Sequence, residues 1–427
     1  MAKEAFFKYI KAAPLTEKVA TRDGCIYMYR LMKFIGWIPP KSAHFLVRCI
    51  YSFYTCITFG FGAFYLPLGF ALSYFKEFDK FTPDEFLTSL QVALNVYGGA
   101  VKCTILYIYL WRLRKTENIL DELDKRAESE VARKKIHETV AFSNYVFLLF
   151  TFIYNGYAGS TFLAYLASGR PPWSVYNPFI DWRDSLRNLF IQANFEYIIM
   201  SFAVIQDQLS DTYLLVFMIL IRGHFTLLMD RVRDLRTDPN KTDEENYEDL
   251  VNCIKDHKKI LDCCNMIRPM ISGTIFVQFG LIGSVLGLTL INIFFFSNLW
   301  RGLASFMFVI AVLMETFPFC YNCNLLIDDC EEFNIRMFQS NWIDAPARYK
   351  TTLIQFMHHA QQPIMFIAGG IIPITMNSNI TVSPLLIYTI FIFYYIKLKY
   401  FYSKKVAKFA FSIITIVREM NLAEQFK

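Results

Sequence analysis

Seven stretches of the chain are each long and apolar enough to cross a lipid bilayer as a helix, which needs roughly 20 mostly apolar residues. They cover about 44–72, 88–110, 139–167, 188–222, 267–296, 303–327 and 363–382. Of the 427 residues, 55% are hydrophobic and 19% are charged, a composition typical of a protein surrounded mainly by lipid. The sequence therefore predicts an all-α fold, that of a polytopic membrane protein with seven transmembrane helices.

The connectors between these stretches differ in their content of Lys and Arg. The 111–138 and 230–268 connectors are rich in both, whereas the 73–88 and 168–187 connectors contain few. Basic residues collect on the cytoplasmic side of membrane proteins. We therefore expect the 1–43 segment and the connectors after spans two, four and six to be cytoplasmic, an orientation opposite to that of G-protein-coupled receptors.

Helical periodicity continues beyond the fourth apolar stretch and begins before the fifth. Val216–Leu235 and Leu250–Met266 carry apolar residues at spacings of three and four, and 236–245 has the composition of a loop. A third amphipathic helix is expected within 328–362. We expect these helices to project into the cytoplasm and to pack on one another.

Several ionisable residues fall inside the apolar stretches, where a charged group is costly. Lys102 is interpreted as an anchor whose long side chain reaches the membrane surface. The acidic residues are Glu196, Asp207, Asp211 and Glu315. They either line a polar cavity or form hydrogen bonds between helices, and we favour the second interpretation.

No pattern typical of an active site occurs in the chain. Phosphate-binding glycine loops and the HExxH and GxSxG patterns of hydrolases are absent. Cys320 and Cys323 form a CxxC without a second pair, and His358 and His359, being adjacent, point to different helix faces. The net charge of +6 is modest, and no nucleic-acid-binding module is visible. We therefore expect neither catalytic residues, a metal site nor a cofactor.

The outer halves of spans two, three and four are rich in aromatic residues. They include Tyr97, Phe152, Tyr154, Tyr157, Phe162, Phe195, Tyr197 and Phe202. Such residues commonly form a belt at the membrane surface. A pocket for a small volatile molecule also needs apolar walls with an occasional hydroxyl, so both interpretations stay open.

Four C-terminal motifs resemble, in their order and spacing, those of the insect odorant receptors. They are Met314–Tyr321 (METFPFCY), Ser340–Trp342 (SNW), Gln361–Met376 (QQPIMFIAGGIIPITM) and Lys408–Ser412 (KFAFS). Gly169–Trp182, with its basic residue, prolines and Asp-Trp pair, looks like the second outer loop of the same family.

The resemblance implies a subunit of an odorant-gated, nonselective cation channel in the plasma membrane of olfactory sensory neurons. It implies small volatile ligands and a hetero-tetramer with an odorant co-receptor. Residues 1–43 would then be cytoplasmic, 44–327 would hold helices one to six with an outer ligand-binding half, 328–362 a cytoplasmic anchor region, and 363–427 a pore-lining seventh helix. A gustatory-receptor-like channel, a G-protein-coupled receptor and a transporter are the alternatives.

The resemblance also implies roles for individual residues. From the aromatic set, the implied ligand contacts are Tyr97, Tyr154, Tyr157, Phe195 and Phe202. Tyr349–Pro363 corresponds to the anchor helix, Ile416 to the hydrophobic constriction of the pore, and Glu419 lies one turn further towards the outside. An apolar ring gates by dewetting, and an acidic ring favours cations.

The segment 382–405 departs from the family pattern. Its residues, rich in Ile, Phe, Tyr and Lys, separate Thr381 from Val406, where the family continues directly along the pore helix. Valine codons begin with GT and one lysine codon ends with AG, the dinucleotides found at the two ends of an intron. A retained intron and a genuine insertion, in which Pro384 would break the pore helix, both stay open.

Overall fold

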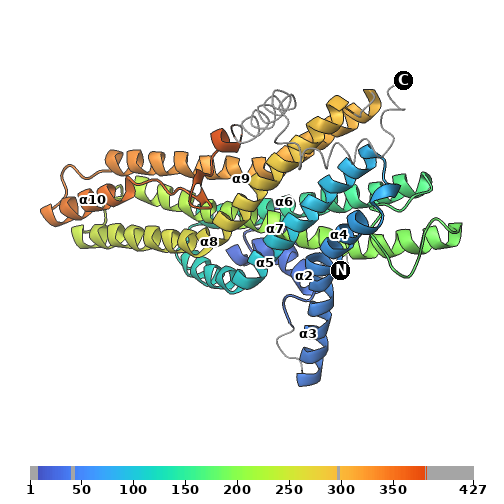
Figure 1. Cartoon of the computed structure of the whole chain (residues 1–427). Helices are drawn as coiled ribbons and strands as arrows, with labels where there is room; N and C mark the ends of the chain where they lie inside the picture. Colours follow the sequence, from blue (N-terminus) through green and yellow to red (C-terminus); the bar gives the residue numbers. More distant parts are fainter. Residues whose placement is uncertain (1–7, 40–43, 296–298, 380, 382–427) are drawn as a thin grey trace.

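Most of the long helices run roughly side by side along one direction, and the helix Phe45–Gly60 points away from them (Figure 1). The computed structural model describes residues 8–39, 44–295, 299–379 and 381. In chain order, the elements are η1 (Thr21–Cys25), α2 (Ile26–Phe34), α3 (Phe45–Gly60), η2 (Phe61–Tyr65), α4 (Leu66–Lys76), η3 (Phe78–Lys80), α5 (Pro83–Asp124), α6 (Glu130–Ala167), α7 (Leu186–Arg233), α8 (Asp243–Phe295), α9 (Leu299–Gln339), α10 (Ala347–Ala360), β1 (Ile367–Ala368) and β2 (Ile372–Pro373).

Within the described part of the chain, five helices are long and apolar enough to cross a membrane. They are Phe45–Lys76, Glu85–Asp124, Glu130–Ala167, Leu186–Arg233 and Asp243–Thr289. The first of these joins α3, η2 and α4 into one continuous span. The expected helical extensions are also confirmed, because α7 continues to Arg233 and α8 begins at Asp243.

Local sequence explains where these helices begin. Thr82 and Glu85 form a capping box at the start of α5, in which each side chain accepts a hydrogen bond from the backbone N–H of the other residue. Ser129 and Ser185 cap α6 and α7 by accepting from the N–H three residues further on. Thr242 caps α8 in the same way.

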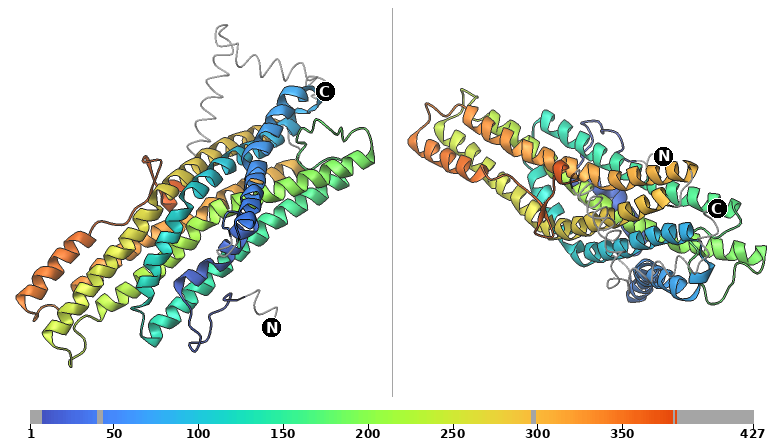
Figure 2. Two further views of the ribbon diagram at one scale, coloured as in Figure 1. Left: turned by 90° about the horizontal axis from the view of Figure 1, so that it is seen from below. Right: turned by 45° about the horizontal axis from the view of Figure 1, so that its top comes forward.

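Helix α7 lies at the centre of the bundle. Its most apolar 18-residue window is 83% buried, compared with 28% for the first span, and it contacts α5, α6, α8 and α9. The end that carries α10, where α7 ends and α8 begins, is called the α10 end here. The loop between α6 and α7, residues 168–185, lies at the opposite end, called the loop end (Figure 2).

The first span contains a π-helical turn, η2. A π turn shifts the hydrogen-bond ladder by one residue and leaves a backbone carbonyl without its usual partner. Gln206 of α7 supplies a partner, because its Nε2 donates to the carbonyl of Thr58 at 2.8 Å. Gly62 faces this amide, and a Cβ at that position would overlap the Gln206 side chain.

The expected seventh span does not begin as a helix. Residues 361–375 form a turn and the two-stranded antiparallel hairpin of β1 and β2, and helix resumes at residue 376. Gly369 and Gly370 adopt φ of +58° and +72°, a conformation that a helix cannot include and that glycine adopts readily. The expectation of a helix over 363–375 is therefore wrong. The helix expected over Tyr349–Pro363 is present as α10, Ala347–Ala360.

Candidate functional site

Lys102 lies about midway along α5 and is 1% exposed. Its Nζ lies 2.9 Å from Oδ1 of Asp207 and 2.7 Å from Oδ1 of Asp211, both on α7, and donates to Oε1 of Gln278 on α8 at 2.7 Å. A lysine within a membrane bundle requires partners of this kind. The expectation that Lys102 reaches the membrane surface is therefore wrong, because its partners lie inside the bundle.

Further hydrogen bonds extend this contact to α6 and α9. Gln278 Nε2 donates to Oε2 of Glu315 at 2.7 Å, and the Tyr154 hydroxyl donates to Oδ2 of Asp211 at 2.9 Å. Together, Lys102, Tyr154, Asp207, Asp211, Gln278 and Glu315 form what we call the buried polar network. Hydrogen bonding between helices is thus confirmed for Asp211 and Glu315, whereas Asp207 contacts the neighbouring helix through its ion pair with Lys102.

Glu196 does not join this network, although it lies on the same helix as Asp207. Its buried carboxylate accepts hydrogen bonds from the backbone N–H of Trp173 and of Val175, each at 2.9 Å, and from Nε2 of Gln192 at 2.8 Å. Ser73 of α4 binds the backbone of the neighbouring loop residues. Glu196 and Ser73 therefore fasten the loop to α7 and α4.

An apolar cluster lies along the bundle between the fastened loop and the buried polar network. Its buried members are Leu66, Phe70, Ala93, Trp173, Val175, Ile199 and Met200. Partly buried aromatic side chains, including Phe61, Tyr65, Tyr74 and Tyr197, pack against it. The loop-end half thus places an apolar cluster beside a few buried polar groups, the combination of side chains expected of a site for a small organic ligand.

The two predicted ligand contacts on α6, Tyr154 and Tyr157, lie in different surroundings. The ring of Tyr154 is in the bundle with its hydroxyl on Asp211, so this residue belongs both to the aromatic set and to the buried polar network. Tyr157 is 56% exposed. Among the described residues, no ring contact joins any two of the five predicted ligand contacts.

The other three predicted ligand contacts, Tyr97, Phe195 and Phe202, contact the first span or α2. Tyr97 donates its hydroxyl to a backbone carbonyl of α4 at 2.8 Å. The ring of Phe195 meets that of Tyr65 edge-on at 5.8 Å between centroids, and Phe202 is stacked on Phe34 at 6.2 Å. These aromatic residues therefore help to seat the first span against α5 and α7.

A polar pocket of about 400 Å³ opens at the loop end. The end of α4 and the loop line it with charged and aromatic groups, including Lys76, Glu77, Tyr176, Trp182 and Arg183. None of the five predicted ligand contacts lines this pocket. The predicted pore residues Ile416 and Glu419 and the segment 382–405 lie outside the described residues.

The neutral partners of the charged groups were not predicted from the sequence. Gln278, Gln192 and Gln206 each connect two elements through a buried amide. The available signal was their position, because glutamine inside an apolar helix is expected to hydrogen bond across helices.

The long apolar helices and the charges buried among them define a helical, polytopic membrane protein. The chain belongs to the insect odorant receptor family, because residues 82–385 match the family described as 7tm Odorant receptor. Odorant receptor 59b of Drosophila melanogaster is 63% identical over 423 residues, which are 99% of this chain and 100% of that protein. Odorant receptor 42b of the same species is 54% identical over 421 residues, 99% of each chain.

A solved structure has the same fold. The olfactory receptor OR5 from Machilis hrabei matches with a TM-score of 0.69 at 14% identity, covering 86% of this chain and 98% of that one. Its complex with eugenol matches with a TM-score of 0.66. The predicted polytopic all-α fold and the odorant receptor family are thereby confirmed, and the chain is a receptor and not an enzyme.

Proposed function

We propose that this chain is the odorant-recognising subunit of a nonselective cation channel in the plasma membrane of olfactory sensory neurons. It binds a small volatile molecule in the loop-end half and opens a pore formed together with an odorant co-receptor. The observation that carries this proposal is the position of Tyr154. Its ring belongs to the aromatic set, while its hydroxyl is bonded to the buried polar network that connects five helices.

The related receptor OR5 from Machilis hrabei forms a complex with eugenol, a small substituted phenol. An apolar site with few polar groups suits molecules of this type, because burial of apolar surface supplies affinity and a hydroxyl or carbonyl supplies orientation. The loop-end half of this chain has that composition.

The distribution of charge supports a cytoplasmic α10 end. The two connectors richest in Lys and Arg, 111–138 and 230–268, lie at that end. Basic residues collect on the cytoplasmic side of membrane proteins. In this orientation the N-terminus is cytoplasmic and the loop end faces outside. An N-terminal epitope tag that antibodies reach on unpermeabilised cells would contradict it.

The pore is assigned to the C-terminal segment, with Ile416 as its hydrophobic constriction and Glu419 as an acidic ring that favours cations. The family match ends at residue 385, close to the start of the 382–405 segment. This ending agrees with an interruption of the family pattern there.

Whole-cell recording with a panel of volatile odorants tests the proposal. We expect odorant-evoked cation current in cells that express this chain with the co-receptor, and none in cells that express it alone. A robust current from the chain alone would contradict the dependence on a co-receptor. Substrate accumulation without current would favour a transporter.

A further inference from the structure

The first turn of the last described helix is bonded to α9 by a hydrogen bond between two side chains. Thr316 donates its hydroxyl hydrogen bond to Oδ1 of Asn379 at 2.8 Å. The two residues are 1% and 5% exposed. A hydrogen bond shielded from water in this way is sensitive to displacement, because neither group can turn to solvent instead.

Thr375 fixes the start of that helix. Its hydroxyl accepts from the N–H of Ser378 at 3.1 Å, and its carbonyl accepts from the N–H of Asn379 at 3.1 Å. This is the geometry of a helix cap. Asn379 therefore lies in the first turn, and its side chain meets α9.

The segment before this helix is held against α8. Arg268 donates to the carbonyl of Met365 at 2.5 Å, and the N–H of Gly369 donates to the carbonyl of Ser272 at 3.1 Å. A Cβ at Gly369 would overlap the ring of Phe276, so the close approach requires glycine.

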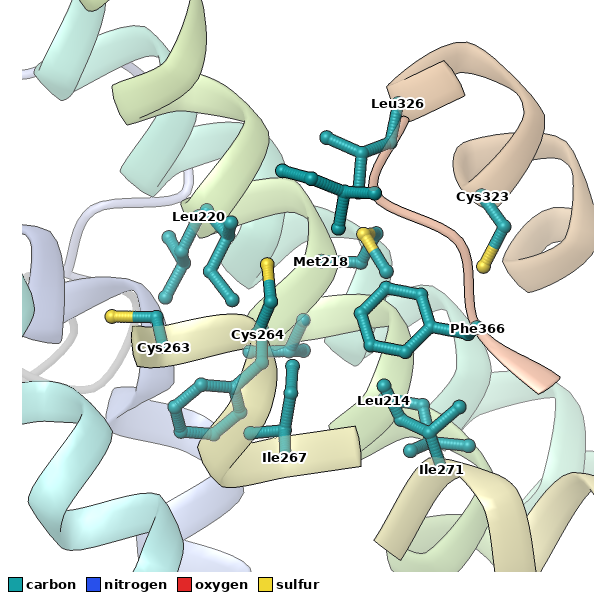
Figure 3. Close-up of a cluster of buried hydrophobic side chains, with 14 of the residues drawn as sticks. Leu214, Met218, Leu220, Cys263, Cys264, Ile267, Ile271, Cys323, Leu326 and Phe366 are labelled. Atoms are coloured by element: carbon teal, nitrogen blue, oxygen red, sulfur yellow. The ribbon is translucent and has the colours of Figure 1, made fainter. Parts of the chain in front are cut away.

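Phe366 anchors the same segment in the core of the bundle. Figure 3 shows its ring among Leu214 and Met218 of α7 and Ile271 of α8. Phe366 is 2% exposed. The backbone that leads to Asn379 is thus fixed on one side by α8 and α7, and Thr316 of α9 holds the other side.

Thr316 directly follows Glu315, a member of the buried polar network. Neighbouring residues on an α-helix point about 100° apart. Glu315 bonds to Gln278 of α8, whereas Thr316 bonds to the last helix. A rotation of α9 that moves one of these side chains therefore moves the other.

The geometry points to Thr316 as a positioning residue that couples the buried polar network to the first turn of the last helix. This inference rests on the proposed function, which assigns the pore to the chain that follows this turn. A ligand that contacts Tyr154 changes the bond to Asp211, and the change reaches Asn379 through Lys102, Gln278, Glu315 and Thr316.

Substitution of Thr316 tests the inference in channels formed with the co-receptor. Thr316→Val keeps the side-chain shape but removes the donor, whereas Thr316→Ser keeps the hydroxyl. We expect Thr316→Val to change the ratio of evoked to basal current about fivefold, the factor that loss of about 1 kcal/mol gives at 25 °C. Thr316→Ser should leave the ratio of evoked to basal current close to that of the unsubstituted channel.

Thr116→Val serves as the matched control. Thr116 is also fully buried, and its hydroxyl donates within its own helix, to the carbonyl of Arg112 at 3.0 Å. In a double-mutant cycle, Asn379→Ala should have little further effect in the Thr316→Val background. Additive effects of the two substitutions, or equal effects of Thr316→Val and Thr116→Val, would overturn the inference.

Hydrogen exchange on the purified chain tests the same contact without a current. Thr316→Val should speed amide exchange in residues 376–379, and Thr116→Val and Thr316→Ser should not. Unchanged exchange in Thr316→Val would overturn the positioning role. If the unsubstituted channel gave no odorant current, the proposed function would fail, and the exchange comparison would still decide whether Thr316 positions the helix.

Discussion

Replacing Lys102 with glutamine should destabilise the receptor more than any substitution of a surface ion pair. The lysine side chain is 2% exposed, and its partners Asp211 and Asp207 are 6% and 29% exposed. Removing one member of a buried ion pair typically costs about 3–5 kcal/mol, because the remaining charge is left without compensation. The Asp207 side chain is only partly buried, so we expect about 3 kcal/mol, the lower end of this range.

Equilibrium unfolding of the purified receptor in detergent, followed by tryptophan fluorescence, measures this difference. Arg348→Gln is the matched control, because Arg348 pairs with Glu244 at 3.4 Å with both side chains mostly exposed, and such pairs contribute about 0–1 kcal/mol. Asp211→Asn added to Lys102→Gln should recover part of the loss, since it removes the uncompensated charge. Equal unfolding midpoints for Lys102→Gln and Arg348→Gln would refute this reasoning.

Four further predictions concern other regions of the chain. Glu196→Ala leaves the buried N–H groups of Trp173 and Val175 without an acceptor, so it should make the 168–185 loop sensitive to limited proteolysis, whereas Glu196→Gln, which keeps an acceptor oxygen, should have a smaller effect. Phe202→Ala and Tyr154→Ala should reorder the odorant panel at unchanged surface expression, because a lost ring removes contacts worth about 1–3 kcal/mol; unchanged dose-response curves for both would place the ligand elsewhere. Ile416→Ala should raise the basal conductance of the co-expressed channel, and an unchanged basal current would remove Ile416 from the gate. Sequencing of cDNA across residues 377–412 should yield transcripts without the codons for 382–405, and transcripts that all contain them would exclude a retained intron.

Apolar length and helical periodicity were sufficient to predict the bundle. The five described membrane-crossing helices follow the first five predicted stretches, and α7 and α8 extend beyond them where the periodicity of Val216–Leu235 and Leu250–Met266 continues. These features depend on the local sequence alone. Each residue contributes its hydrophobicity, and the helix repeat determines which face is apolar.

The partners of Lys102 could not be predicted in the same way. Whether a lysine in an apolar stretch reaches the membrane surface or pairs inside the bundle depends on which neighbouring helices face it. Asp211 and Gln278 lie 109 and 176 positions away in sequence. Likewise, a hydrogen bond between helices was expected for Glu196, but its carboxylate binds the backbone of the loop.

The hairpin before the last helix shows how turn residues override hydrophobicity. The apolar content of 363–375 indicated a membrane helix, yet the segment contains Gly369, Gly370 and Pro373. Two glycines with positive φ end a helix regardless of the hydrophobicity of their neighbours. The motif that identified the family therefore also contained the signal against a continuous helix.

The π turn in the first span determines which sequence changes that span can tolerate. Before the turn, Thr55 and Thr58 donate to backbone carbonyls of the 35–36 segment, and after it Ser73 binds the loop. A π turn accommodates one extra residue, so deleting one residue between Thr58 and Leu66 would restore a regular α-helix with its two halves nearly in phase. Deleting a second residue there would rotate one half against the other by about 100°. One set of contacts would then be lost, so chain length within this span is constrained even where residue identity is not.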